Sequence, residues 1–555
     1  LPKDDVIVTT ACVAYWKYDD IDDITQQFAS HFGHNFFLEV QPHNNEKQAT
    51  LNTHILELRK SLGCSIIAGT DSHFIDEKDA SIRDDFLLSK SMQYDDEAGW
   101  YMDYPDADTL YKRFANQAVL SHDEIVEAMQ NTLLLRDVEE YDSPVFNDDI
   151  KMPTLYPDYT QEQRNEEYLK LVYAGWDEYK VSVPEDKWPE YLREIEYETQ
   201  AVCDTGMADY FIDNYYIIKK GIENGGTLTR TGRGSGCSYL TNKLLGFSDI
   251  DRVSATVHLF PDRFMSKSRV LESKSLADID HNEYPVEPFA RAQKEVLGEE
   301  HSYPMLAYGT LKASAAWKLY AKAQGVPFEI ANEVSERIKR YELAVKHADE
   351  DEKDNIDIVK FIGSEFEKIY QKSKDYLGVI TSWSIHPCSY LIYSGDIKEE
   401  VGLVRIKDHI VCLMDGKWGE AGHFLKQDHL CVNVVQMIYA MFRSIGQEPP
   451  TVKELLDMCP PEDKVWDIYE RACCLGINQV EKETTAARAA KYKPHNIAEL
   501  TAFVAAIRPG FASLYKKFEN REHYSFGIES LDSLLQTPEM PESWLLYQES
   551  IMAVL

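Results

Sequence analysis

The chain has 555 residues, which is enough for three or four domains with sizeable cores. Its net charge is −36, from 94 acidic and 58 basic residues, so a protein whose whole surface binds nucleic acid is excluded, whereas a local basic groove is not. No run of about 18 uncharged apolar residues occurs, which predicts that no segment spans a membrane. Residues 1–20 also lack the apolar stretch of a signal peptide.

Basic residues gather in two stretches, and the cysteines are scattered. The basic stretches contain Lys482, Arg488, Lys491, Lys493, Arg508, Lys516, Lys517 and Arg521, and separately Arg263, Lys267, Arg269 and Lys274. Solvated surface charge is the alternative interpretation of both stretches. The 10 cysteines include no C-x-x-C pair, so we expect free thiols in a reducing cytoplasm rather than a zinc ribbon.

Short apolar runs and helical periodicity alternate at the start of the chain. The runs at 6–8, 36–40 and 65–69 predict buried parallel strands, and helices are expected over 24–32 and 49–62. This alternation is typical of an α/β domain. Prolines at positions 144, 153 and 157 predict a linker over 140–160.

The rest of the chain is predicted to be mainly helical, interrupted by a few strands. Helices are expected over most of 161–220, over 237–245 after a glycine-rich turn, over much of 312–378, from about 432, and through most of 450–555. Strands are expected at 391–393, at 409–413 and in a segment ending near Asp428.

A glycine-rich loop precedes the helix expected from Cys237. Its sequence is Gly232-Arg233-Gly234-Ser235-Gly236. Glycines allow the backbone to turn sharply and to approach a ligand closely, and a helix N-terminus presents free N–H groups and a positive dipole end. The loop therefore predicts an anion site, to which Ser235 adds a hydroxyl and Arg233 a charge. A flexible loop that only caps a helix is the alternative.

Two acids stand at i and i+2 in Asp278-Ile279-Asp280. On a strand, both side chains face the same way and repel each other unless a divalent cation lies between them. Mg²⁺ prefers such oxygen ligands together with substrate phosphates. The same tripeptide also occurs at 20–22 and 249–251, so the order of motifs decides. A glycine loop, a helix, D-x-D and a third acid, Asp428, follow the layout of polymerase-β-like nucleotidyltransferases.

Eight motifs, collinear from about residue 200 to the last residue, carry a more specific resemblance. After the glycine loop they lie at 262–270, 275–281, 308–315, 386–392, 425–432, 502–511 and 545–552. In this order they resemble E-R-F-L-N-P-E-R-V, P-D-F-D-I-D-F, F-G-T-M-A-A-K-A, H-A-A-G-V-V-I, V-K-F-D-F-L-G-L, A-L-V-A-L-x-R-P-G-P and I-L-Y-Q-E-Q-V-M. The chain thus resembles the alpha subunit of bacterial DNA polymerase III, a C-family replicative polymerase.

The resemblance implies a multidomain fold of α/β and α+β parts. It implies the C-terminal part of a PHP (polymerase and histidinol phosphatase) α/β domain over 1–140 and a polymerase-β-like nucleotidyltransferase palm in two segments, 141–322 and 379–432. A helical thumb is expected over 323–378, inserted between the palm segments. Incomplete helical fingers are expected over 433–555.

The same resemblance implies template-directed DNA synthesis from deoxynucleoside triphosphates on a primer. Two Mg²⁺ ions would be held by Asp278, Asp280 and Asp428. The residues implied to bind the triphosphate are Arg233, Gly234, Ser235, Gly236, Lys426 and Arg508. Lys426 would share a strand face with Asp428, and its alternative role is to neutralise that acid. Arg508 has two alternative roles, capping a helix or binding template phosphate.

The N-terminal region also resembles the end of the PHP domain. Glu39, His43, Asp71 and His73 are metal-ligand types at matching positions, and Zn²⁺ or Mn²⁺ would suit them. The opening H-x-H segment of that domain is absent from this sequence. We therefore expect a remnant that packs against the palm rather than a complete metal cage.

The sequence departs from the family at two kinds of place. Both catalytic motifs have a His, His281 and His429, where the family has Phe, and we hypothesise that these two form a pair or share a polar partner. The sequence stops within the fingers, so the expectation is either a second polypeptide, as in a split viral or mobile-element gene, or a partial sequence. The sliding clamp would then be reached only through missing regions.

Two other functions remain open at this point. One is a weakened, polymerase-derived scaffold that binds DNA or a partner chain. The other is a PHP-type metal phosphoesterase.

Overall fold

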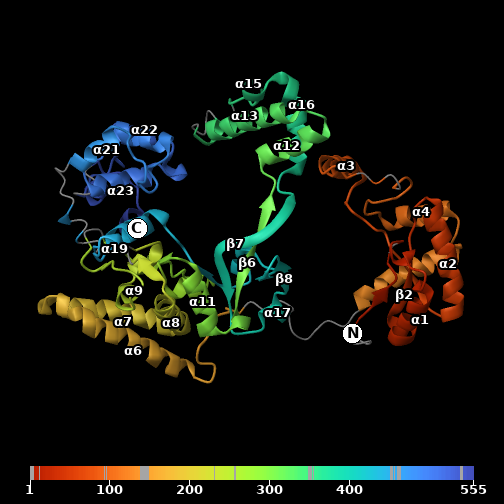
Figure 1. Ribbon diagram of the computed structural model, residues 1–555, viewed down its shortest axis with the longest axis horizontal. Coiled ribbons are helices and arrows are strands. Elements are labelled where there is room, and N and C mark those ends of the chain that lie inside the picture. Colours follow the sequence, from red (N-terminus) through yellow and green to blue (C-terminus); the bar gives the residue numbers. More distant parts are fainter. Residues whose placement is uncertain are drawn as a thin grey trace. The chain divides into compact units, whose positions relative to one another are not determined.

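The computed structural model divides into two compact units (Figure 1). The structure describes residues 6–11, 13–92, 94, 97–137, 149–229, 232–255, 258–347, 353, 355–450, 454, 457–458, 464–537 and 542–554. The first unit is drawn from 1–145, 311–342 and 357–379, and the second from 146–310, 343–356 and 380–555. In the described part of the chain, no helix has the length and apolarity needed to cross a membrane. The described cysteines are free thiols.

The first unit contains a parallel three-stranded sheet in the order β1-β2-β3. Its elements are β1 (Val8–Thr9), α1 (Ile21–Phe32), β2 (Phe36–Val40), α2 (Glu46–Leu62), β3 (Ser65–Ala68), α3 (Ala80–Ser89), α4 (Ala107–Gln117) and α5 (His122–Asn131). Buried side chains of β2 and β3 pack with Ile55, Phe114 and Ile125. The predicted α/β pattern of the first 80 residues is therefore confirmed, whereas much of the predicted linker 140–160 lies outside the described residues.

Polar residues at the helix starts explain where these helices begin. The side chain of Asn45 accepts a hydrogen bond from the Gln48 N–H at the start of α2, and Asp106 does the same for α4. At the start of α5, Ser121 and Glu124 cap each other's backbone N–H groups. Such caps satisfy N–H groups that have no partner inside the helix.

A helical cluster with its own core also belongs to the first unit (Figure 1). Its helices are α12 (Ala313–Ala323), α13 (Phe328–His347), α15 (Val359–Ile362) and α16 (Ser364–Ser373). Trp317 and Ala321 of α12 are fully buried among residues of the later helices. Residues of α12 that precede the predicted thumb boundary at residue 323 thus share this core. Lys322 also donates to the backbone oxygen of Ser89 in α3.

The second unit is organised around a five-stranded sheet in the order β10-β7-β6-β9-β8. The strands are β6 (Ser302–Thr310), β7 (Ile380–Ile392), β8 (Leu403–Ile406), β9 (His409–Cys412) and β10 (Leu425–Asp428). All neighbours are antiparallel except β6 and β9. The sequence predicted β9, β10 and the end of β7, but it missed β6 and β8.

Helices and a two-stranded sheet form the main core of the second unit. They are α6 (Gln161–Tyr179), α7 (Trp188–Asp204), α8 (Ala208–Glu223), α9 (Leu240–Leu244), α10 (Lys267–Leu271) and α11 (Glu287–Leu297), with β4 (Thr227–Thr229) paired to β5 (Asn282–Tyr284). Phe211, Phe264 and Phe289 lie fully buried in this core. Leu425 of β10 joins the same cluster, so the third candidate acid is carried by a strand that is anchored in it.

A separate aromatic core joins α21 (Asp467–Glu470), α22 (Glu483–Tyr492), α23 (Ile497–Ala506) and α24 (Tyr515–Glu519). The other helices of this part of the chain are α17 (Ile397–Glu400) and α18 (Gly416–Ala421) between the strands, α19 (Asn433–Ser444), α25 (Glu529–Leu535) and α26 (Gln548–Val554). Tyr492 stacks between Phe503 and Phe518, at 5.7 and 4.7 Å between ring centroids. The region from 464 onward is thus mainly helical, as predicted.

Candidate active site

Asp428 ends the edge strand β10, opposite Ser389 of β7. The Ser389 hydroxyl donates to Asp428 Oδ1, and Lys426 Nζ lies 3.1 Å from Asp428 Oδ2. Lys426 also lies 3.8 Å from a carboxylate oxygen of Glu420. Both oxygens of Asp428 are therefore engaged by this chain, and Lys426 shares its strand face as expected.

Asp278 and Asp280 do not lie on a strand, which corrects the sequence-based prediction. Strand β5 begins only at Asn282, and the Asp280 N–H donates to the Asp278 carbonyl oxygen at 3.1 Å, which bends the chain. The Ile279 N–H donates to the hydroxyl oxygen of Tyr210 at 2.9 Å. The segment is thus held by a turn and a buried tyrosine instead of a strand ladder.

A backbone bridge places this bent segment beside β10. Asn282 forms a parallel bridge with Leu430, and the Glu283 N–H donates to the Leu430 carbonyl oxygen at 2.7 Å. Two residues before each bridge partner stand Asp280 and Asp428. The bridge therefore brings the residues that follow Asp280 alongside those that follow Asp428.

Electrostatic coupling joins the three acids. Asp278 is exposed at the protein surface, yet surrounding protein atoms raise its pKa to about 6; Lys426 opposes this rise, and the charges of Asp280 and Asp428 add to it. Burial also raises the pKa of Asp280, with Arg233 opposing and Asp428 adding. Burial and the charges of all three acids raise the pKa of the Tyr210 hydroxyl. The structure therefore gathers the predicted acids into one negative cluster.

The glycine loop packs directly against this cluster. Gly234 has φ +61°, and a Cβ there would lie 2.4 Å from Asp280 Oδ2. Gly232 has φ +84°, and a Cβ there would lie 2.6 Å from Ile250. Only glycine suits both the backbone conformation and the space at these positions. Arg233 donates to the Asn282 side chain at 3.0 Å, next to Asp280.

The helix after the loop does not offer the free N-terminus that the sequence predicted. The loop passes through a short 3₁₀ turn, Ser235–Ser238, and α9 begins at Leu240 instead of Cys237. The N–H groups of Leu240 and Thr241 each donate to the buried carboxylate of Glu198 at 2.8 Å. Glu198 in turn accepts from Arg252 Nε at 2.6 Å. These amides serve an internal carboxylate, so anion binding would depend on the loop itself.

A cavity of about 400 Å³ opens beside Asp278. Its lining residues are Arg269, Ser273, Lys274, Ser275, Leu276, Asp278, Glu420, His423, Phe424, Leu425 and Lys426. The sequence identified Arg269 and Lys274 only as part of a basic stretch, because nothing local shows that they meet β10. The cavity joins an acidic edge to a basic wall, which suits a phosphate group bridged to metal ions.

Arg508, which was predicted to bind the triphosphate, has no described contact with the acidic cluster. It is exposed just beyond α23, and it donates to the Gln479 side chain at 3.3 Å. Among the described residues, no hydrogen bond joins Arg508 to the acids or to the glycine loop. Its assignment remains a prediction.

The predicted PHP residues are largely engaged within the first unit. Glu39 accepts from Thr9 and Gln41, each at 2.8 Å. His43 is buried, its Nδ1 accepts from the Tyr101 N–H at 3.1 Å, and burial is the main cause that lowers its pKa to about 4.

The other two predicted PHP residues are close in the chain: a ring nitrogen of His73 lies 2.9 Å from the Asp71 carbonyl oxygen. Across the ranges that the structure describes, no three His, Cys, Asp or Glu side chains are arranged to hold an ion. The first unit thus offers no ready metal cage in that part of the chain.

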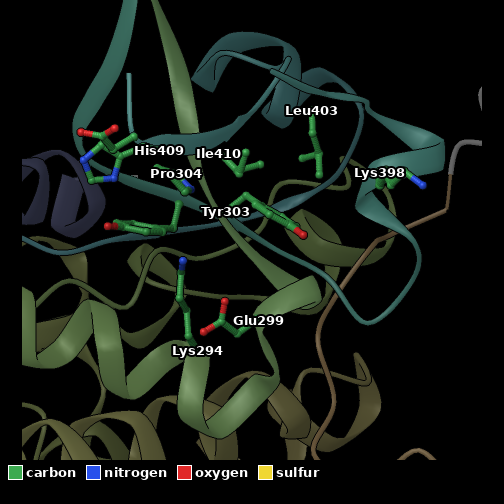
Figure 2. Close-up of a pocket in the computed structure, with 10 residues that line it drawn as sticks. Lys294, Glu299, Tyr303, Pro304, Lys398, Leu403, His409 and Ile410 are labelled. Carbon is green, nitrogen blue, oxygen red and sulfur yellow. The ribbon is translucent and has the colours of Figure 1, made fainter. Parts of the chain in front are cut away.

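A larger cavity of about 750 Å³ lies elsewhere in the second unit (Figure 2). Its lining residues are Lys294, Glu299, Tyr303, Pro304, Tyr390, Lys398, Leu403, Asp408, His409 and Ile410. Figure 2 shows Lys294 projecting from α11, with Glu299 beside it and Tyr303 and Pro304 on the opposite side of the cavity. None of the predicted site residues lines it, and its charges of both signs define no ligand class.

The second unit is thus a mixed α/β fold that places an acidic cluster beside a glycine loop. The family model described as the bacterial DNA polymerase III alpha NTPase domain matches residues 165–431. The model described as the finger domain of the same subunit matches residues 434–555. The chain therefore belongs to the bacterial DNA polymerase III alpha family.

Curated relatives agree with this assignment. The DNA polymerase III subunit alpha of Aquifex aeolicus is 22% identical over 592 residues, which cover 99% of this chain and 50% of the relative. Those of Chlamydia muridarum and Bacillus subtilis are both 23% identical, and the matches cover 94% and 95% of this chain and 46% of each relative. The chain thus spans about half the length of the curated relatives it matches.

Proposed function

We propose that this chain carries the nucleotidyl-transfer centre of a DNA-directed DNA polymerase, which adds nucleotides to a primer 3′-hydroxyl. The observation that carries the proposal is the coupled cluster of Asp278, Asp280 and Asp428 against the glycine loop. In this proposal the five-stranded sheet and its helices form the palm, and the helices from α19 onward belong to the fingers. The helical cluster that includes α12 forms the thumb, and the sheet of the first unit is the PHP remnant.

The donor set of this site suits a pair of Mg²⁺ ions. Carboxylates that raise one another's pKa are stabilised when a divalent cation neutralises them. In the described structure Lys426 and Ser389 occupy the oxygens of Asp428, which explains why no ready ion cage is formed there. Asp278, Asp280 and Asp428 would hold the ions once Lys426 turns toward substrate phosphate.

Bound Mg²⁺ would supply an activated primer hydroxyl and charge neutralisation at the leaving pyrophosphate. The chain's own residues would do the positioning. Gly234 and Ser235 bring backbone and hydroxyl donors next to Asp280, and Arg233 adds positive charge there. Lys426, Lys274 and Arg269 form the basic wall of the cavity beside Asp278. Catalysis would then rest on orientation and electrostatic stabilisation.

Primer-template DNA and deoxynucleoside triphosphates are the proposed substrates. A second polypeptide and a sliding clamp are further proposed partners. The PHP residues carry no proposed activity, because Glu39 is engaged by Thr9 and Gln41 and the ring Nδ1 of His43 by Tyr101.

Primer extension with Mg²⁺ tests the proposal, with the chain assayed alone and together with the C-terminal half of a relative. Asp280→Asn is expected to abolish extension. Asp22→Asn is the matched control, since Asp22 ends the same Asp-Ile-Asp tripeptide at the start of α1 in the first unit, where its side chain is half exposed. Extension that survives Asp280→Asn would reject this site as the source of the activity. No extension by the wild type in either format would reject the proposed activity in favour of a binding scaffold.

A further inference from the structure

A fully buried carboxylate links the two segments that carry the candidate acids. Glu283 is 1% exposed and lies in β5, three residues after Asp280. His281 Nε2 lies 2.7 Å from Glu283 Oε1, and His429 Nδ1 lies 2.8 Å from Glu283 Oε2. The hypothesis that the two histidines share a polar partner is therefore confirmed, and the partner is Glu283.

The cluster continues away from the acids. The Gln293 side-chain nitrogen donates to the Ser302 hydroxyl at 2.6 Å, so its oxygen faces His429 Nε2 at 3.2 Å. With this amide placement, the two ring nitrogens of His429 face oxygen atoms of Glu283 and Gln293. Burial by itself raises the pKa of Glu283, but His429 and His281 outweigh it and hold the pKa below its ordinary value.

This cluster connects the segment that follows Asp280 to the segment that follows Asp428. Each histidine directly follows a candidate acid, since His281 follows Asp280 and His429 follows Asp428. The Glu283 N–H also donates to the Leu430 carbonyl oxygen, so backbone and side chain of one residue both tie the two segments together. A change in the reach of Glu283 would shift one acid relative to the other.

We propose that Glu283 is a positioning residue that sets the spacing of Asp280 and Asp428 for their two metal ions by clamping His281 to His429. The inference rests on the proposed function, because it assigns the ions to that site. Two ions about 3.5–4 Å apart tolerate little error in their ligands, so a buried clamp directly behind them determines metal affinity. Among the described residues the clamp does not itself form a metal site.

The family resemblance supports this view of the clamp, since it places Phe at both histidine positions. An apolar layer can hold two strands by packing, whereas this chain holds them by hydrogen bonds to one carboxylate. A buried charged cluster is costly to break but can often be replaced as a whole by packed apolar side chains. The clamp and the apolar layer are therefore two solutions to one positioning problem.

Mn²⁺ binding, measured by the loss of free-ion signal in electron paramagnetic resonance, tests the clamp. The Asp280→Asn variant provides the background from weak binding to this acidic chain. Glu283→Gln is expected to weaken the specific Mn²⁺ affinity by about 10–100-fold, as outer-shell changes do. Glu283→Asp keeps the charge but shortens the reach, and it is expected to weaken affinity by about tenfold if Glu283→Gln fails to fold.

Two further variants separate positioning from other roles. The triple variant His281→Phe/Glu283→Leu/His429→Phe restores an apolar layer and is expected to return affinity to within about threefold of wild type. Asp251→Asn changes another partly buried carboxylate, one held by Tyr179 and Tyr191, and is expected to leave Mn²⁺ affinity unchanged.

Wild-type affinity in both Glu283→Gln and Glu283→Asp would overturn the proposal. Affinity that stays low in the triple variant would also overturn it, because Glu283 would then act on the ions directly. Since the readout is ion binding, a chain that binds Mn²⁺ but extends no primer would reject the proposed activity and still test the clamp.

Discussion

Removal of the Glu198 carboxylate should destabilise the second unit strongly. The Glu198 side chain is fully buried, and the Arg252 side chain is only 4% exposed. Glu198→Ala leaves Arg252 and the N–H groups of Leu240 and Thr241 without their shared acceptor. Breaking a buried pair in this way costs about 3–5 kcal/mol of unfolding free energy. Glu194 still holds Arg252 at 2.6 Å, so we expect the lower end of this range.

Urea unfolding followed by tryptophan fluorescence measures this loss. Glu194→Gln is the matched control, because Glu194 contacts the same arginine from a partly exposed position and should cost less than about 1 kcal/mol. The double variant Glu198→Leu/Arg252→Met is expected to recover most of the stability, since packed apolar residues can replace a buried pair. A loss below about 1 kcal/mol for Glu198→Ala would refute this account of how the glycine loop and α9 are held.

Four further predictions concern the acids and the loop. The pKa of Asp278 is raised from 3.8 to about 6, so protons compete with Mg²⁺ for this carboxylate below that pH. The Mg²⁺ concentration for half-maximal extension should therefore rise as the pH falls below about 6. A Mg²⁺ concentration that stays constant across this pH range would contradict the prediction. Without metal, the folded state holds this proton more tightly than the unfolded chain, so the stabilisation present at low pH is lost as the pH rises through about 6. Asp278→Asn should therefore resist urea better than wild type near neutral pH. Ser389→Ala removes the hydroxyl that donates to Asp428. The variant is expected to slow single-nucleotide extension by about tenfold without changing the urea midpoint of unfolding. An unchanged rate would show that the hydroxyl is dispensable. Gly234→Ala would place a Cβ 2.4 Å from Asp280 Oδ2 and should reduce extension by about 100-fold. Gly225→Ala is the control, because Gly225 has φ +94° but no atom within 4 Å of its Cβ, so this variant should only lower stability. Equal extension activity of the two variants would show that the close contact between Gly234 and Asp280 does not matter.

Local patterns in the sequence predicted several parts of the fold and the site. The apolar runs of the first 80 residues became β2 and β3 with α1 and α2 around them. A strand was expected to end near Asp428, and β10 ends at that residue. The glycine loop was expected to lie beside the acids, and it approaches Asp280 so closely that only glycine fits at position 234. These features could be predicted because each depends on local residues, which either determine the backbone conformation themselves or form one apolar face that packs in the core.

Contacts between distant residues decided the parts that local patterns missed. The start of α9 is capped by Glu198, which stands 42 residues before Leu240, so its N–H groups looked free in the sequence. Asp278 and Asp280 were expected on a strand, but a turn and the Tyr210 hydroxyl hold them instead.

Two further features have no local signal in the sequence. Glu283 is one acid among 94, so its burial cannot be inferred from its neighbours in the chain. Only the burial of Trp317 shows that α12 shares the core of the helices that follow it.

We propose that Asp278, Asp280 and Asp428 act together on one pair of metal ions. Anomalous scattering from crystals soaked in Mn²⁺ and a non-reactive nucleotide would locate these ions. We expect two peaks about 3.5–4 Å apart, in contact with all three carboxylates and absent from Asp280→Asn crystals. Peaks that contact only one of these acids, or that appear only near His43 in the first unit, would contradict it.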